Sequence, residues 1–154
     1  MELVINLEEL KQLVNEKSEE NKSFRIFLES QDPQKVDKIV QRLDREINPK
    51  IDCVECGYCC HNLRPVATDE ELLKYVEPER LEELRYAEGI VCKNLDGNFC
   101  TIYKDRHFEC RAFPYLDRDN FIKRIIGVMN NYEICPIVYN VVEALKVELE
   151  WKWE

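Results

Sequence analysis

The sequence predicts an α+β fold that is mainly helical, with flanking helices around a small cysteine-rich domain that carries a short β-hairpin. Apolar residues recur at three- and four-residue steps before residue 50 and after residue 136, a period typical of helices. All eight cysteines fall between these stretches, and Asp96-Gly97 marks a tight hairpin turn among them. We therefore expect a helical N-terminal extension packed on the core (1–50), a cysteine-rich metal-binding domain (51–136) and a C-terminal helix (137–154).

Two helical patterns occupy the N-terminal extension. The first is an apolar stripe at helical spacing, made of Leu3, Leu7, Leu10 and Val14. The segment around Phe24 and Ile26 fits either a continuation of this face or a short strand. A clearer helix begins at Asp32-Pro33, where Asp32 can cap the first turn and Pro33 suits its first position. Asn48-Pro49 ends that helix.

Shorter elements follow the first cysteines. Pro65 breaks the chain, and Thr68 with Glu71 matches a capping box, which predicts a helix through Tyr75. Glu77-Pro78 begins another helix, which we expect Gly89 to end.

The segment from Ile90 to Tyr103 is predicted to be a hairpin turned at residues 96–97. In this register Cys92 lies almost opposite Thr101, and Cys100 lies one step away. Two sulfurs on the two arms could then approach one site, although a small register error would change the face they share.

The remaining elements are predicted from aromatic and proline positions. Residues 104–118 suggest a polar loop interrupted by aromatics, and residues 121–129 fit a strand or a short helix. Cys135-Pro136 begins the last helix, since proline suits the first turn. Its buried face should be Val138, Val141, Val142, Leu145 and Leu149. Trp151 and Trp153 would pack on the domain or form an exposed contact patch.

Composition argues against several classes of partner. The net charge is −9 and the pI is near 4.9, so phosphate-rich nucleic acids and anionic membranes would be repelled. No stretch approaches the roughly 20 apolar residues that span a bilayer. The start Met1-Glu2-Leu3 lacks a secretory pattern, so we expect a cytoplasmic protein with reduced or metal-bound thiols rather than disulfides. This composition is compatible with a protein partner. It does not indicate which oligomeric state the protein has.

The densest chemical signal is the run from Cys53 to Cys60, which holds four of the eight cysteines. Cys53, Cys56 and Cys59 are spaced by two residues and can curl their sulfurs around one metal centre, with Gly57 free to adopt positive φ. The same rhythm opens bacterial iron–sulfur ligand runs, whereas structural zinc sites usually draw two pairs from separate knuckles. The spacing therefore favours an iron–sulfur cluster, of the [4Fe–4S] type, over zinc.

The division of the ligands is left open by the sequence. Cys110 or Cys135 could be the fourth ligand beside the three cysteines spaced by two residues. Cys135 is preferred because Pro136 follows it, as in ferredoxin-type runs. Cys59 and Cys60 are neighbours, and adjacent side chains of an extended backbone point apart. This pair suggests either two four-cysteine sites or one site plus thiols with another task.

Charged residues beside the cysteines are candidate cofactor-binding groups. Arg64, Arg106 and Arg111 lie near cysteines in an otherwise acidic chain. Guanidinium groups there could offset the negative charge of a thiolate-held cluster, bind an anionic substrate group, or form ordinary salt bridges. His61 and His107 could ligate zinc, although a lone histidine in a polar turn more often does not.

Together these motifs resemble one protein family. The matching pieces are the Cys53–Cys60 run, Cys92-x7-Cys100-Thr101-Ile102-Tyr103, Cys110-Arg111-Ala112-Phe113-Pro114 and Cys135-Pro136. They are similar to the CxxCxxCC family (YkgJ-like) of zinc- or iron-chelating proteins, over roughly residues 51–136. Relatives tend to have Arg-Pro at Arg106-His107, a departure that should alter only the loop before Cys110.

The resemblance implies metal binding through all eight cysteines: Cys53, Cys56, Cys59, Cys60, Cys92, Cys100, Cys110 and Cys135. Family members are often labelled iron–sulfur oxidoreductases, and a related motif occurs in a flagellin lysine methylase. Several functions therefore stay open at this point. The chain could be a metal-binding protein holding an iron–sulfur cluster or zinc, an iron–sulfur oxidoreductase or electron carrier, a component of a protein methyl-transfer system, or a structural zinc-binding interaction module.

Overall fold

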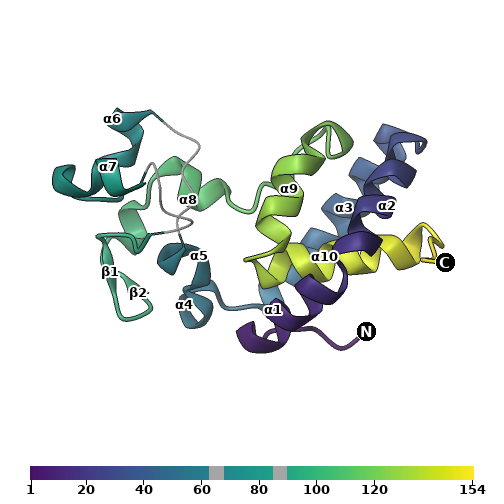
Figure 1. Ribbon diagram of the computed structural model, residues 1–154, viewed down its shortest axis with the longest axis horizontal. Helices are drawn as coiled ribbons and strands as arrows, with labels where there is room; N and C mark the ends of the chain where they lie inside the picture. The colour runs from purple at the N-terminus through teal and green to yellow at the C-terminus, as the bar shows by residue number, and fades with distance from the viewer. Residues whose placement is uncertain (63–67, 85–89) are drawn as a thin grey trace. The chain divides into compact units, whose positions relative to one another are not determined.

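The computed structural model describes residues 1–62, 68–84 and 90–154, and the chain divides into two compact units (Figure 1). One unit, the helical unit, combines residues 1–51 with 113–154, and the other, the cysteine-rich unit, is residues 52–112. The prediction of a mainly helical α+β protein is confirmed, since the described sheet has two strands and the other elements are helices. The sequence placed the end of the cysteine-rich segment at residue 136, whereas in the structure residues 113–136 belong to the helical unit.

The helical unit contains five α-helices and two short 3₁₀ turns within the described residues. They are α1 (Leu7–Glu16), α2 (Ser18–Glu29), α3 (Pro33–Ile47), η1 (Asn48–Lys50), η4 (Ile122–Arg124), α9 (Ile125–Tyr132) and α10 (Pro136–Glu148). Asp32 caps α3 as predicted, because its carboxylate accepts from the backbone N–H groups of Gln34 and Lys35. The segment around Phe24 is helical, so the strand alternative there is wrong, and residues 121–129 are also helical.

Helix α10 forms the centre of the helical unit and lies beside α1, α3 and α9 (Figure 1). Four residues of its predicted face are fully buried: Val138, Val141, Val142 and Leu145. Trp151 packs on Phe24 with ring centroids 5.1 Å apart, while Trp153 is 52% exposed. The buried side chain of Asn140 exchanges two hydrogen bonds with the backbone of Val4, at 2.9 and 2.8 Å, which ties the N-terminal segment to α10.

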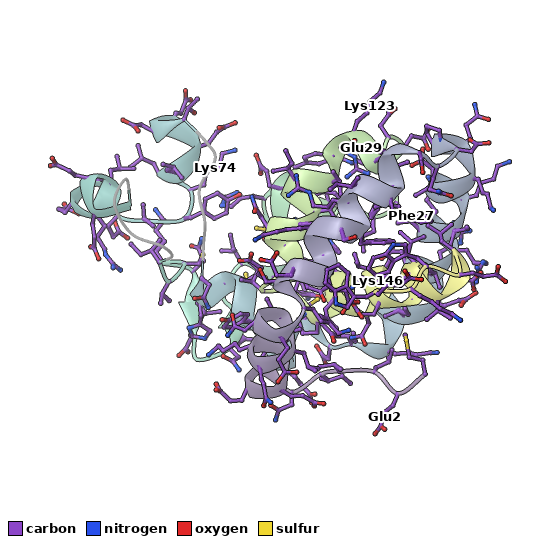
Figure 2. All side chains as sticks on the ribbon, turned by 45° about the vertical axis from the view of Figure 1, so that its right-hand side comes forward. Glu2, Phe27, Glu29, Lys74, Lys123 and Lys146 are labelled. Atoms are coloured by element: carbon purple, nitrogen blue, oxygen red, sulfur yellow. The ribbon has the colours of Figure 1, made fainter. Side chains whose placement is uncertain are left out.

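A buried charged network also lies in this unit, around Lys146 on α10 (Figure 2). Only 4% of Lys146 is exposed, and its Nζ donates to Glu20, Asn21 and Glu143 at 2.8, 2.7 and 2.6 Å. Lys17 pairs with the second oxygens of both glutamates, at 3.2 and 3.1 Å. Each buried charge is therefore paired, which offsets much of the free energy of removing it from water.

Two side chains hold residues 113–121 on the helical unit by hydrogen bonds to their backbone. The Asp37 carboxylate accepts from the backbone N–H groups of Asn120 and Phe121, both at 2.9 Å. Arg124 donates to the carbonyl oxygens of Tyr115, Arg118 and Asp119. Leu116 and Phe121 are buried in the same core as α10. These contacts explain why the segment after Ala112 leaves the cysteine-rich unit.

The cysteine-rich unit is built from short elements. They are α4 (Cys53–Cys56), α5 (Tyr58–His61), α6 (Asp69–Leu72), η2 (Pro78–Arg80), α7 (Leu81–Leu84), β1 (Leu95–Asp96), β2 (Phe99–Cys100), η3 (Tyr103–Asp105) and α8 (Phe108–Ala112). The capping box of Thr68 and Glu71 is confirmed at the start of α6, which ends at Leu72 and continues to Tyr75 only as turns. Residues 104–118 are not simply a loop, because η3 and α8 occupy part of them. The predicted breaks at Pro65 and Gly89 lie outside the described residues.

The hairpin is present, but its predicted register is wrong. Leu95 pairs with Cys100 and Asp96 with Phe99, so the turn lies at Gly97-Asn98 rather than at residues 96–97. Gly97, which has a φ of +60°, therefore occupies the first central position of the turn and not the second. Regular pairing stops after two residues on each arm, and Cys92 precedes the strand in a turn closed by a bond from Leu95 N–H to its carbonyl.

The two units differ in how much apolar surface they bury. The helical unit holds a large continuous core, whereas the buried cluster of the described cysteine-rich residues is Leu72, Val76 and Ile90, with Tyr75 and Leu81 against it. Among the described residues no helix has the length and apolar character needed to cross a membrane.

Candidate metal centre

The first cysteines lie on two one-turn helices joined at Gly57. Asp52 caps the first of them, because its carboxylate accepts from the N–H groups of Val54 and Glu55 at 2.8 and 3.4 Å. Gly57 then reverses the chain with a φ of +56°, as the sequence predicted. A Cβ at this position would also lie 3.0 Å from side-chain atoms of Asn98. Glycine is therefore required twice, for the left-handed backbone and for the close approach.

Asn98, at the hairpin turn, fastens the hairpin to this cysteine run. Its amide nitrogen donates to the carbonyl of Glu55 at 3.1 Å. Its amide oxygen lies 2.8 Å from Nε2 of His61, and since that oxygen can only accept, the imidazole donates. His61 is thus engaged by a side chain of the hairpin, which is an alternative to the ligand role considered from the sequence.

A backbone hydrogen bond brings a fifth cysteine beside the run. The N–H of Cys92 donates to the carbonyl of Cys60 at 2.8 Å. Asn94 then places its amide nitrogen 3.7 Å from the Cys92 sulfur, and its carbonyl accepts two bonds from Thr101 at 2.8 Å. Cys100, next to Thr101, pairs with Leu95 in the hairpin. The sequence thus folds locally so that the Cys60, Cys92 and Cys100 segments are connected by hydrogen bonds.

Cys110 is joined to the same unit through Tyr75. The Tyr75 hydroxyl hydrogen-bonds to the Cys110 sulfur and lies 3.4 Å from a Glu109 oxygen, while its carbonyl accepts from Lys93 N–H at 2.6 Å. His107 packs edge-on against the Tyr75 ring at 5.2 Å and hydrogen-bonds to a backbone carbonyl through Nε2. His107 therefore has a packing role in this structure.

The thiols of the cysteine-rich unit share one electrostatic environment. Burial raises the pKa of Cys53, Cys56, Cys92 and Cys110, and the charge of neighbouring sulfurs raises each further. Cys60 is the sulfur common to all four of these interactions. Thiols that raise one another's pKa in this way are those that a shared cation would deprotonate together.

Cys59 and Cys60 interact directly, against the expectation for adjacent residues of an extended backbone. They lie in the one-turn helix α5, and the Cys59 thiol hydrogen-bonds to the Cys60 sulfur. This bond lowers the pKa of Cys60 to about 6, against the opposing effect of burial and with help from the nearby charges of His61 and Arg106. Its lowered pKa favours the thiolate form of Cys60, in contrast to the raised pKa of Cys53, Cys56, Cys92 and Cys110.

Cys135 differs from the other seven cysteines. It lies in the helical unit, precedes the first turn of α10, is 6% exposed and belongs to the continuous apolar core. Its role as a ligand stays a prediction. All eight cysteines lie among the described residues, and none forms a disulfide. Within residues 1–62, 68–84 and 90–154, no three His, Cys, Asp or Glu side chains are gathered closely enough to hold a metal ion.

The predicted arginines have different surroundings. The guanidinium of Arg106 lies over the ring of Tyr103, 4.0 Å from its centroid, and its charge acts to lower the pKa of both Cys53 and Cys60. Arg111 donates from Nε to the carbonyl of Arg106 at 2.9 Å, so its side chain supports the backbone. Arg64 lies outside the described residues.

Sequence reasoning missed several residues that organise this region, namely Tyr75, Asn94, Asn98 and Tyr103. Asn98 could have been suspected from its place after Gly97 in a two-residue turn. The position of Tyr103 three residues before Arg106 is another usable signal. Tyr75 and Asn94 act through contacts with distant segments, for which the sequence offers no local indication.

One protein family matches this region by its sequence profile. Its description is "CxxCxxCC: Putative zinc- or iron-chelating domain", and the match covers residues 52–136, which is more than half of the chain. The chain belongs to this family. The resemblance inferred from the cysteine motifs is thereby confirmed, and with it the assignment to a zinc- or iron-chelating family. No curated protein and no solved structure matches the chain.

Proposed function

We propose that residues 52–112 hold an iron–sulfur cluster or a zinc ion through their cysteines, and that this centre keeps the unit folded. The observation that supports the proposal most is the combination of seven cysteines with the small apolar cluster that the described residues of this unit form. Below about 70–80 residues a hydrophobic core rarely supplies more than about 3–5 kcal/mol, and natural domains of this size add disulfides or a structural metal. The cysteines form no disulfide, so their thiols are free to serve as ligands of a structural metal.

The donor set fits such a centre chemically. Cysteine thiolates are the ligands of iron–sulfur clusters and of closed zinc sites. Burial and mutual repulsion raise the pKa of most of these thiols, and a bound cation reverses both effects. Since no three ligands are gathered closely among the described residues, binding would draw the sulfurs together, and its free energy would order the segment.

The proposed ligand set is narrower than the eight cysteines that the family pattern suggests. We assign the ligands to the seven cysteines of residues 52–112 and assign Cys135 to the core of the helical unit. The support is the burial of Cys135 among apolar side chains. Three ligands from one loop at two-residue spacing still favour a [4Fe–4S] cluster over zinc, and the cation of Arg106 suits the negative charge of such a cluster.

Electron transfer is the second candidate function. Neighbouring protein atoms partly desolvate the thiols of Cys53 and Cys110, but both residues keep exposed surface, so a cluster that they ligate would lie near the protein surface, where a redox partner can approach. A cytoplasmic location is part of the same proposal, because thiol ligands persist in a reducing compartment.

The test is metal analysis of the full chain purified without oxygen from cells supplied with iron. We expect stoichiometric iron and sulfide, with the broad visible absorption of thiolate-to-iron charge transfer. Stoichiometric zinc in colourless protein would keep the metal centre and exclude the cluster. Protein that contains neither metal, and that binds neither on reconstitution, would refute the proposal.

A further inference from the structure

We propose that Asn94 positions the hairpin cysteines for metal binding, and that its side-chain amide donates a hydrogen bond to the sulfur of Cys92 when that sulfur binds the metal. This inference rests on the proposed function. It gives one uncharged side chain a task that neither the family description nor the cysteine pattern assigns. Asn94 is a positioning residue, because it contacts a ligand sulfur and not the metal.

The first observation is a contact between the Asn94 amide and a cysteine sulfur. Nδ2 of Asn94 lies 3.7 Å from Sγ of Cys92, which is the separation of a hydrogen bond to sulfur, a larger atom than oxygen. An amide nitrogen can only donate, so the sulfur accepts. Hydrogen bonds to an ionised acceptor are roughly twice as strong as those between neutral groups. The bond that the structure shows should therefore strengthen when the sulfur becomes a metal-bound thiolate.

The second observation is that the turn after α6 anchors this amide. Nδ2 of Asn94 also donates to the backbone carbonyl of Lys74, at 3.1 Å, and an amide NH₂ group has one hydrogen for each of its two acceptors. Lys93 holds the same turn, because its Nζ donates to the carbonyl of Leu73 at 2.9 Å and its backbone N–H to that of Tyr75 at 2.6 Å. A side chain fixed in this way loses little entropy when its bond to sulfur strengthens.

The third observation connects Asn94 to the other arm of the hairpin. Its backbone carbonyl accepts from both the N–H and the hydroxyl of Thr101, each at 2.8 Å. Thr101 follows Cys100, which pairs with Leu95, the neighbour of Asn94. The backbone of Asn94 thus holds the Cys92 and Cys100 segments together, while its side chain orients the Cys92 sulfur. A substitution of the side chain removes only the second of these effects.

The experiment measures metal affinity in the full chain. Metal-free, reduced protein is titrated with Zn²⁺ against a chromophoric chelator, for the wild type, Asn94→Leu and Asn62→Leu. Leucine has nearly the shape of asparagine but lacks its donors. Asn62 is the matched control, since its Nδ2 donates to the backbone carbonyl of Tyr58, at 3.0 Å, within the same unit. We expect zinc binding to weaken about 10–100-fold in Asn94→Leu, the usual effect of removing a hydrogen bond to a metal ligand, and much less in Asn62→Leu.

If the full chain holds an iron–sulfur cluster instead of zinc, the reduction potential of the cluster replaces the affinity as the quantity measured. Hydrogen bonds to the sulfurs help to set this potential, and a donor raises it by stabilising the additional negative charge of the reduced form. We expect a lower potential in Asn94→Leu than in the wild type and in Asn62→Leu. An unchanged potential in Asn94→Leu would overturn the inference, and so would equal zinc affinities of the two variants.

A spectroscopic measurement distinguishes the proposed bond from a merely structural role. In wild-type protein loaded with an NMR-active cadmium isotope, a side-chain amide proton of Asn94 should show scalar coupling to the metal through the sulfur of Cys92. Cadmium binding without this coupling would overturn the inference and leave the proposed function intact. If the wild type binds neither zinc, cadmium nor an iron–sulfur cluster, the proposed function fails, and the inference fails with it.

Discussion

Replacing Cys135 and Cys60 by alanine, one at a time, tests the proposed division of the cysteines between core and metal. Cys135 is 6% exposed in the core of the helical unit, whereas the charge of Cys60 raises the pKa of four other thiols of the cysteine-rich unit. We expect Cys135→Ala to keep the metal and Cys60→Ala to lose it. Alanine is preferred to serine at Cys135, since a buried hydroxyl would add a desolvation penalty of its own.

The size of the Cys135→Ala effect follows from its burial. The substitution removes one buried heavy atom, comparable to a single methylene, and should lower the free energy of unfolding by about 0.5–1.5 kcal/mol. In a chain of this length 1 kcal/mol corresponds to about 2–4 °C, so the melting temperature should fall by about 1–6 °C. The backbone bonds at this position, from Cys135 N–H to Asn131 and from Tyr139 N–H to Cys135, remain possible with alanine.

The assay is the metal-to-protein ratio after oxygen-free purification, with thermal unfolding followed by circular dichroism on the same samples. The expected pattern is a full metal ratio with a small melting shift for Cys135→Ala, and a strongly reduced ratio for Cys60→Ala. Loss of metal from Cys135→Ala comparable to that from Cys60→Ala would refute the assignment. The eight-cysteine ligand set would then stand.

Four further outcomes are expected. A strong chelator should remove hydrogen-exchange protection from residues 52–112 but leave the helical unit protected, because the large apolar core that the described residues form lies in the helical unit. Uniform protection after verified metal removal would contradict this. Gly57→Ala should destabilise the metal-loaded unit by about 1–2 kcal/mol, the usual cost of a left-handed non-glycine residue, with further strain against Asn98; chemical denaturation measures it. Lys146→Met should lower the free energy of unfolding by about 1–3 kcal/mol, because it leaves Lys17 as the remaining cationic partner of the part-buried Glu20 and Glu143 carboxylates and removes a donor from Asn21. Burial disfavours the charged form of Glu20, but Lys146 and Lys17 lower its pKa below the ordinary value of 4.5. The stability that Glu20 contributes should therefore be present above pH 4.5 and be lost as the pH falls through the lower pKa of the folded state. Glu20→Gln should remove this part of the acid sensitivity when melting is measured as a function of pH.

The features that could be predicted from the sequence are those set by neighbouring residues. Asp32-Pro33 begins α3 and Thr68 with Glu71 caps α6, because donor and acceptor are separated by three residues or fewer. Gly57 adopts positive φ between two cysteine pairs for an equally local reason. The family assignment belongs to the same class, since it depends on spacing along the chain and not on contacts.

The features that could not be predicted depend on distant contacts. The end of the cysteine-rich unit follows from Asp37, whose carboxylate holds backbone groups 83 and 84 residues further along. The hairpin register depended on which glycine-containing pair formed the turn, and a shift of one residue moved the pairing partners of Cys100. Asn98 approaches Gly57 closely, and no local sequence pattern predicts that the hairpin turn lies beside the cysteine run.

The two units obtain their stability from different sources, and this difference bears on function. The helical unit buries a continuous apolar core and pairs every charge of the Lys146 network, so we expect it to fold without a ligand. The cysteine-rich unit has a small apolar cluster and raised thiol pKa values, both of which a bound metal would improve. Under the proposed function, we expect a chain built in this way to stay partly folded when the metal is absent. Metal loading would then change the order of residues 52–112, and we propose that this change is the property a partner could recognise.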